Sequence, residues 1–111
     1  MENRKAVRQG DIYFTPLEKA PDWLRLGERE PKPDGVIARG EATSHTHRVA
    51  VLEDAQVYQV GSETFLRVSE RGVSIVHDEH RPVTLAPSTL YEIHRAREFD
   101  YLAGLMRTVR D

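Results

Sequence analysis

The chain has 111 residues, of which 39% are hydrophobic and 31% charged, and this balance suits one folded domain rather than a disordered segment. There is no cysteine, which excludes a disulfide framework and leaves only imidazole and oxygen ligands for any metal ion. The formal net charge of −2 makes nucleic acid a possible but not a favoured partner.

The chain is expected to be a single domain, residues 1–111, with residues 1–9 as a charged N-terminal arm and residues 10–109 as a β-barrel. No run approaches the roughly 20 apolar residues that span a bilayer, and the polar N-terminus lacks the apolar region of a secretory leader. The sequence therefore predicts a soluble, cytoplasmic protein with no membrane partner.

Short runs of alternating polar and apolar residues, separated by turn residues, predict β-strands along most of the chain. The first strand is expected at residues 11–17, where Pro16 indicates an edge position or an early end. Further strands are expected at residues 35–39, 47–52, 56–60, 64–68, 73–77, 82–85 and 90–95. Residues 99–109 form either an interrupted strand or a short closing helix, because a short apolar run does not distinguish the two.

The long segment at residues 18–34 is rich in proline and predicts a loop. One helical turn is expected in PDWLRL, since Pro21 suits the start of a helix. Trp23, Leu24 and Leu26 are expected to fold this loop over the barrel mouth or against a partner subunit. A homodimer is expected because the open strands of a small sheet need cover.

These elements predict an all-β fold, a single small β-barrel or double-stranded β-helix. It would have roughly eight or nine short strands and at most one or two short helical turns. The spacing of turn signals, every 8–12 residues or so, is typical of this class.

The candidate functional residues are two groups of closely spaced histidines. His45 and His47 in HTH point to the same face of a strand, because side chains alternate along a strand. His77 ends the apolar face of another strand, and His80 follows three residues later in HDEH. The predicted metal ligands are therefore His45, His47, His77 and His80.

Imidazole with carboxylate suits a divalent metal such as zinc, iron, nickel or manganese, whose identity the sequence leaves open. Asp78 and Glu79 are candidates for carboxylates that orient a ligand histidine. His94 is interpreted as a surface residue, and whether it joins the site with Glu53 or Glu92 stays open.

The order Gly40, His45, His47, Glu53 and Gly61 resembles the first motif of the cupins. In APSTLYEIH, Glu92 occupies the position nearest the histidine of the second cupin motif. This resemblance covers about residues 40–97 and implies a double-stranded β-helix that holds a metal. The segments RQGD, GEATSHTHR, HDEH and REF also resemble those of uncharacterised small bacterial and phage proteins, which implies no activity.

Three functions are compatible with these residues. The leading hypothesis is a metal-binding, cupin-like protein of unknown substrate, with a small anionic ligand paired by Arg48 or Arg95. The first alternative is a metal-independent phosphodiesterase or RNase-like enzyme that uses His47, His80 and Arg48 or Arg81 as acid, base and charge partner. The second is a non-catalytic β-barrel module that binds protein or nucleic acid. The sequence does not decide whether the protein is an enzyme.

Overall fold

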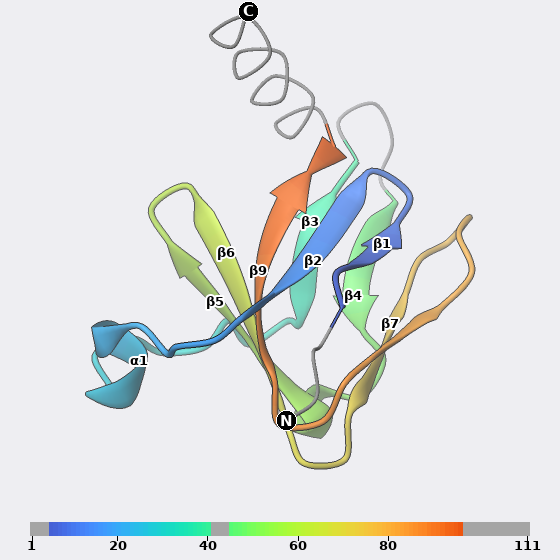
Figure 1. Ribbon diagram of the computed structural model, residues 1–111. Coiled ribbons are helices and arrows are strands. Elements are labelled where there is room, and N and C mark those ends of the chain that lie inside the picture. The colour runs from blue at the N-terminus through green and yellow to red at the C-terminus, as the bar shows by residue number, and fades with distance from the viewer. Residues whose placement is uncertain (1–4, 41–44, 97–111) are drawn as a thin grey trace, which may run out of the picture.

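Figure 1 shows a computed structural model of the chain, which describes residues 5–40 and 45–96. This part of the chain contains nine β-strands, one short helix and one 3₁₀ turn, and every strand pairing is antiparallel. The predicted all-β fold is confirmed. The tail expected at residues 99–109 lies outside the described residues.

Five strands form the first sheet, in the order β1-β2-β9-β6-β5. They are β1 (Val7–Gln9), β2 (Ile12–Leu17), β9 (Leu90–Arg95), β6 (Glu63–Val68) and β5 (Ala55–Val60). Only the first half of β2 pairs with β1. Pro16 therefore lies where β2 has no neighbour on that side, which is the edge position predicted for it.

Four strands form the second sheet, in the order β3-β4-β7-β8. They are β3 (Val36–Arg39), β4 (Thr46–Val49), β7 (Val73–Val76) and β8 (Val83–Leu85). β3, β7 and β8 lie within one residue of the boundaries predicted from the alternating pattern, but β4 ends at Val49, three residues before the predicted end. Leu52, which was predicted as the last residue of that strand, instead begins the 3₁₀ turn Leu52–Asp54 that leads to β5.

The hydrophobic core lies between the two sheets and takes side chains from both. Ile12, Phe14 and Tyr91 belong to the first sheet, and Val49 and Ile75 to the second. The pairing keeps the sheets separate, and β1 contacts β8 without forming a strand ladder in the described part of the chain. In the described part of the chain, the strands therefore do not close into the barrel predicted from the sequence, since no ladder of hydrogen bonds joins β1 to β8.

Residues 7–9 were predicted to belong to the charged N-terminal arm, but in the structure they are part of the folded sheet. Val7 packs against the core, and Gln9 is only 2% exposed. These residues form β1, which continues into β2 through a tight turn at Gly10 and Asp11. This turn brings polar residues to one end of the molecule, next to the start of β4 (Figure 1).

The predicted helical turn is confirmed as α1 (Asp22–Arg25), which follows Pro21. Its Trp23 ring lies 5.2 Å from the Tyr58 ring and 5.3 Å from the Phe65 ring, measured between centroids. Tyr58 and Phe65 pair across β5 and β6, and their neighbours Val57 and Leu66 face the core. Trp23 therefore covers the outer face of this hairpin rather than a barrel mouth.

No helix in residues 5–40 or 45–96 is long and apolar enough to cross a membrane.

Candidate functional site

The structure brings together the four histidines predicted as metal ligands. His47 lies on β4, His45 immediately precedes it, and His77 directly follows β7. Because Arg48 pairs with Val76, the same register extended by one residue places His47 opposite His77. The sheet pairing therefore explains why histidines far apart in the sequence meet.

The distances between ring centroids show how tightly the cluster is packed. The His77 ring lies 4.3 Å from His47, 4.5 Å from His80 and 5.7 Å from His45. The His47 and His80 rings are stacked, with centroids 6.2 Å apart. His77 thus stands at the centre, in contact with the other three.

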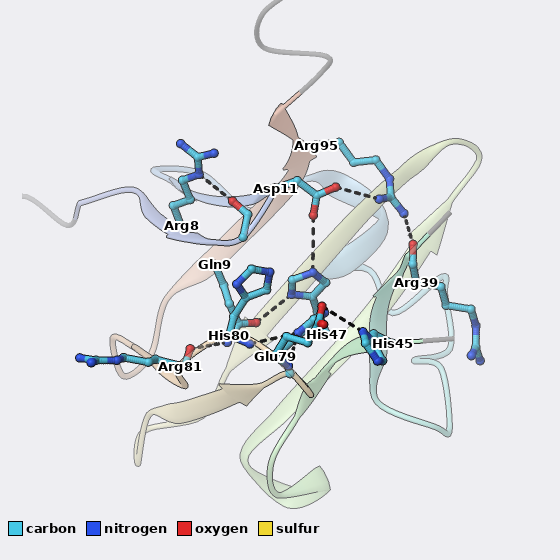
Figure 2. Close-up of polar contacts among 12 residues, drawn as sticks. Arg8, Gln9, Asp11, Arg39, His45, His47, Glu79, His80, Arg81 and Arg95 are labelled. Carbon is cyan, nitrogen blue, oxygen red and sulfur yellow. Dashed lines mark hydrogen bonds and ion pairs between the residues drawn. The ribbon is translucent and has the colours of Figure 1, made fainter. Parts of the chain in front are cut away.

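Gln9 holds the most buried member of the cluster. The His47 side chain is 4% exposed, and its Nδ1 lies 2.8 Å from Oε1 of Gln9 (Figure 2). The Gln9 Nε2 group donates hydrogen bonds of 2.9 Å to two backbone carbonyls, those of Ile75 and Arg81. Both amide protons are used, so the Gln9 oxygen must be the atom that faces the imidazole.

This arrangement defines the tautomer of His47. A carbonyl oxygen only accepts hydrogen bonds, so Nδ1 of His47 carries the proton and donates it to Gln9. In the neutral ring, Nε2 then carries a lone pair. A histidine whose second nitrogen donates to an amide or carboxylate oxygen is the usual arrangement of a metal-ligating imidazole.

Asp11 faces that second nitrogen. Its Oδ1 lies 3.6 Å from Nε2 of His47, and its Oδ2 lies 3.4 Å from Nη1 of Arg95. Arg95 also donates a 2.7 Å hydrogen bond from Nη2 to the Arg39 carbonyl (Figure 2). Arg95 therefore anchors the carboxylate to β9 and β3, and the carboxylate borders the imidazole.

The connecting residue, Gly10, makes room for the cluster. Its φ is +60°, and a Cβ atom built on it would lie 2.5 Å from Nε2 of His80. Only glycine satisfies both the turn and this close approach. RQGD was noted in the sequence as a shared segment, but Gln9 and Asp11 were not predicted as site residues. Their one available signal was this segment, because their contacts join residues far apart in the chain.

Electrostatics keeps the central imidazoles neutral. Burial, the largest cause, and the neighbouring His77 ring lower the pKa of His47 to about 4, although the Asp11 carboxylate acts in the opposite direction. Burial and the neighbouring His80 and His45 rings also lower the pKa of His77. Both rings therefore carry no charge near neutral pH, as metal ligation or hydrogen bonding through a lone pair requires.

Two carboxylates border the cluster on the side of His45. Its Nδ1 lies 3.2 Å from Oε1 of Glu79, and its Nε2 lies 3.9 Å from Oδ2 of Asp78. Asp78 also lies 3.8 Å from Nη1 of Arg48. The residues expected as orienting carboxylates thus contact a histidine of the cluster.

The remaining candidates lie elsewhere. Tyr91 and Ile93 face the core from β9, so Arg95 continues that face, while His94 and Glu92 point to the opposite one. His94 Nε2 lies 3.5 Å from Oε1 of Glu92. Glu53 is exposed in the 3₁₀ turn. Glu53, Glu92 and His94 therefore do not belong to the cluster formed by the other four histidines.

The donor atoms of the cluster do not converge on one point. In residues 5–40 and 45–96, no group of three or more histidine, aspartate or glutamate side chains is arranged as the ligands of one metal ion. The arrangement places the lone pair of His47 Nε2 beside the Asp11 carboxylate, with further imidazoles around them.

The fold and the site define a small two-sheet β protein with a buried, neutral imidazole held between an amide and a carboxylate. The chain belongs to the family described as a domain of unknown function, DUF8820, whose model matches residues 8–96. This match includes Gln9, Asp11, Arg95 and all four clustered histidines. No curated protein and no solved structure matches the chain.

Proposed function

We propose that this is a metal-binding, cupin-like protein in which His47 and Asp11 supply the first two ligands of a divalent metal ion. The observation that carries the proposal is the lone pair of His47 Nε2, which faces the Asp11 carboxylate at 3.6 Å. Two electron-pair donors in this position repel each other unless a proton or a cation lies between them. The low pKa of His47 favours the cation over the proton.

The separation of the two atoms supports this choice. Two ligands on one tetrahedral zinc ion, at ordinary bond lengths, lie about 3.4 Å apart. The third ligand would be His80, whose ring is stacked with that of His47 at 6.2 Å between centroids, or His45, which contacts His77. His80 is exposed on the turn before β8, so its side chain rotates without disturbing the core. Zinc, iron, nickel and manganese all accept such a set of nitrogen and oxygen ligands.

An ion held by these residues would polarise an oxygen-bearing ligand or activate water. The chain's own residues supply orientation and charge. Arg95 holds Asp11 in place, and Arg48 lies beside Asp78 at the rim, where it can pair the charge of a small anionic ligand.

The test is the metal content of untagged protein, measured by mass spectrometry, after loading with each metal and desalting. Wild-type protein should hold about one ion per chain, and His47→Ala and Asp11→Asn should hold none. His94→Ala is the matched control, since His94 lies on the other face of β9, and it should retain the ion. Metal-free wild-type protein after all four loadings would overturn the proposal.

We also propose that the protein is a cytoplasmic homodimer. The absence of cysteine suits a reducing compartment. Leu26, which is 65% exposed, is an apolar side chain available for contact with a second copy. Light scattering at micromolar concentration tests the dimer, and a monomer mass would contradict it.

A further inference from the structure

A groove lies at the end of β9 that is remote from the histidine cluster (Figure 1). β9 begins at Leu90, which lines the groove, and ends at Arg95, which holds Asp11 beside the cluster. The two ends of the strand are roughly 17 Å apart, since a strand rises about 3.4 Å per residue. The groove has a volume of about 510 Å³, which is within the range of sites that hold small molecules. It is therefore a second candidate binding site, separate from the cluster.

Two turns form one wall of this groove, and hydrogen bonds tie them together. The turn that follows β6 contributes Ser69, and the turn that precedes β9 contributes Ser88 and Thr89. The Ser88 N–H donates to the Ser69 carbonyl at 2.9 Å. The Val68 N–H donates to the Thr89 carbonyl at the same distance. Because both turns are fixed by backbone contacts, the wall is formed before any ligand arrives.

Ser88 is held in a strained conformation within this wall. Its φ is +53°, and in residues 5–40 and 45–96 it is the one residue other than glycine with a positive φ. Glycine adopts this conformation without strain. The Ser88 hydroxyl forms no hydrogen bond with another residue of the described chain. Since strained residues concentrate at functional sites, the hydroxyl is a group that a ligand in the groove can use.

Arg67 gives the groove an open positive charge. It is exposed on β6, and its guanidinium forms no ion pair or hydrogen bond with any residue that the structure describes. Arg25, which also lines the groove, is paired with Asp22 at 2.5 Å. Arg71, in the turn after β6, is paired with Asp54 at 3.1 Å. Arg67 is therefore the arginine of the groove that is ready to pair with an anion.

We propose that this groove binds a small amphipathic monocarboxylate. A carboxylate accepts two parallel hydrogen bonds from one guanidinium, and Arg67 supplies both. The hydroxyls of Ser69 and Ser88 supply further donors. The Ser69 Oγ accepts a 3.2 Å hydrogen bond from the Arg71 N–H, which leaves its own proton for the ligand. This binding requires no metal ion, so it is independent of the function proposed above.

The other lining residues restrict the rest of the ligand. Leu24 and Leu90 are half-buried and offer an apolar surface, on which a hydrocarbon tail is removed from water. Glu70 also lines the groove and is exposed, so it repels a second negative charge on the ligand. A monocarboxylate therefore fits better than a dicarboxylate, and an amine fits poorly because it would face Arg67.

The first test compares three probes of equal chain length, octanoate, octanedioate and octylamine, by isothermal titration calorimetry. The protein is treated with chelator and held at about pH 7, where all three probes are ionised. Octanoate should bind at about one molecule per chain, and the other two at least about tenfold more weakly. Equal affinity for octylamine or octanedioate, or no saturable binding of octanoate, would overturn the proposal.

The place of binding is read from the backbone amide chemical shifts during the octanoate titration. The shifts of Ser69, Ser88 and Leu90 should change, whereas that of His47, at the other end of the molecule, should not. Changes confined to the histidine cluster would place the carboxylate there and overturn the proposal.

Variants of the two donors complete the test. Arg67→Gln and Ser88→Gly should each raise the Kd for octanoate about tenfold, since each removes a donor to a charged group. Ser88→Gly should do so while raising Tm, so a loss of folding would not explain the weaker binding. Arg29→Gln is the matched control, because Arg29 is an exposed arginine outside the groove lining, and its Kd should not change. Unchanged affinity in either donor variant, or an equal loss in Arg29→Gln, would overturn the proposal.

Discussion

The Oε1 atom of Gln9 accepts a 2.8 Å hydrogen bond from Nδ1 of His47, and both side chains are almost fully buried. Because the Gln9 amide also bridges two carbonyls, those of Ile75 and Arg81, it connects β1 to β7 and to the turn before β8. One side chain thus joins the two sheets and orients the imidazole at the centre of the site.

Replacing Gln9 by alanine should destabilise the protein and weaken metal binding. Two buried polar groups, His47 Nδ1 and the Ile75 carbonyl, and the part-buried Arg81 carbonyl would lose their partner, which costs about 2–4 kcal/mol in the free energy of unfolding. The loss of a group that orients a ligand histidine should lower metal affinity by about 10–100-fold. Urea denaturation and metal titration measure the two effects. Gln59→Ala, at an exposed position of β5, should change stability by about 0.5 kcal/mol or less.

The stability of the metal-free protein should depend on pH through His47. The unfolded chain binds this proton at about pH 6.5, but the folded protein binds it only near pH 4. The stabilisation is therefore complete above about pH 6.5 and is lost as the pH falls through about 4. It amounts to about 3 kcal/mol. His77 changes stability in the same direction, because its pKa is also lowered.

Urea denaturation of wild type and His47→Gln, at about pH 7 and about pH 4, isolates this contribution. The variant should lose less stability on acidification than the wild type, since carboxylates titrate in both proteins and cancel in the difference. Parallel pH profiles would show that His47 is not kept neutral by its surroundings.

Gly10→Ala should displace the His80 side chain, whereas Gly61→Ala should leave it in place. Their φ angles are +60° and +62°, so alanine meets the same backbone strain at each, about 1 kcal/mol. Only at Gly10 does the added Cβ meet a side chain, His80 at 2.5 Å. Because His80 is exposed and rotates away from the new methyl group, the two variants should lose similar stability, and only Gly10→Ala should change the chemical shifts of His80. Unchanged His80 shifts in Gly10→Ala would contradict the coupling between the turn and the cluster.

Ser88→Gly should stabilise the protein. Ser88 has a φ of +53°, a conformation that costs a non-glycine residue about 1–2 kcal/mol, and glycine recovers this less its own loss of backbone entropy. The expected gain is about 0.5–1 kcal/mol, seen as a rise of a few degrees in Tm. Since the Ser88 backbone N–H bonds to the Ser69 carbonyl, the substitution leaves that contact in place. An unchanged or lower Tm would mean that the serine hydroxyl stabilises the turn.

Trp23→Ala should destabilise the protein by about 1–2 kcal/mol, because it removes a half-buried ring that packs against the Tyr58 and Phe65 rings. Thermal unfolding measures this loss. Light scattering on the same variant separates two roles of the loop. An unchanged mass means that Trp23 acts within its own chain, whereas a change from dimer to monomer would place it at the interface as well.

The alternation of polar and apolar residues was enough to predict most of the strands, because it follows directly from side chains pointing to opposite faces. It also placed His45 and His47 on one face and grouped them with His77 and His80. Whether the strands close into a barrel was not encoded in that pattern. Closure depends on hydrogen bonds between the edge strands of the two sheets, and in the described residues β1 and β8 are in contact without forming a ladder.

The roles of the histidines depended on tertiary structure alone. Gln9 and Asp11 carried no signal by composition or spacing, and they reach His47 only because the β1–β2 turn lies beside β4. His94 resembled the other histidines in sequence, yet the alternation of β9 turns it to the opposite face. By itself, the sequence determined the class of fold and the two local histidine groups, HTH and HDEH, since both follow from local periodicity. Their meeting in one cluster depended on the pairing of β4 with β7. The partner of each ring nitrogen was decided by the tertiary structure, because hydrogen bonds between distant strands have no local pattern to mark them.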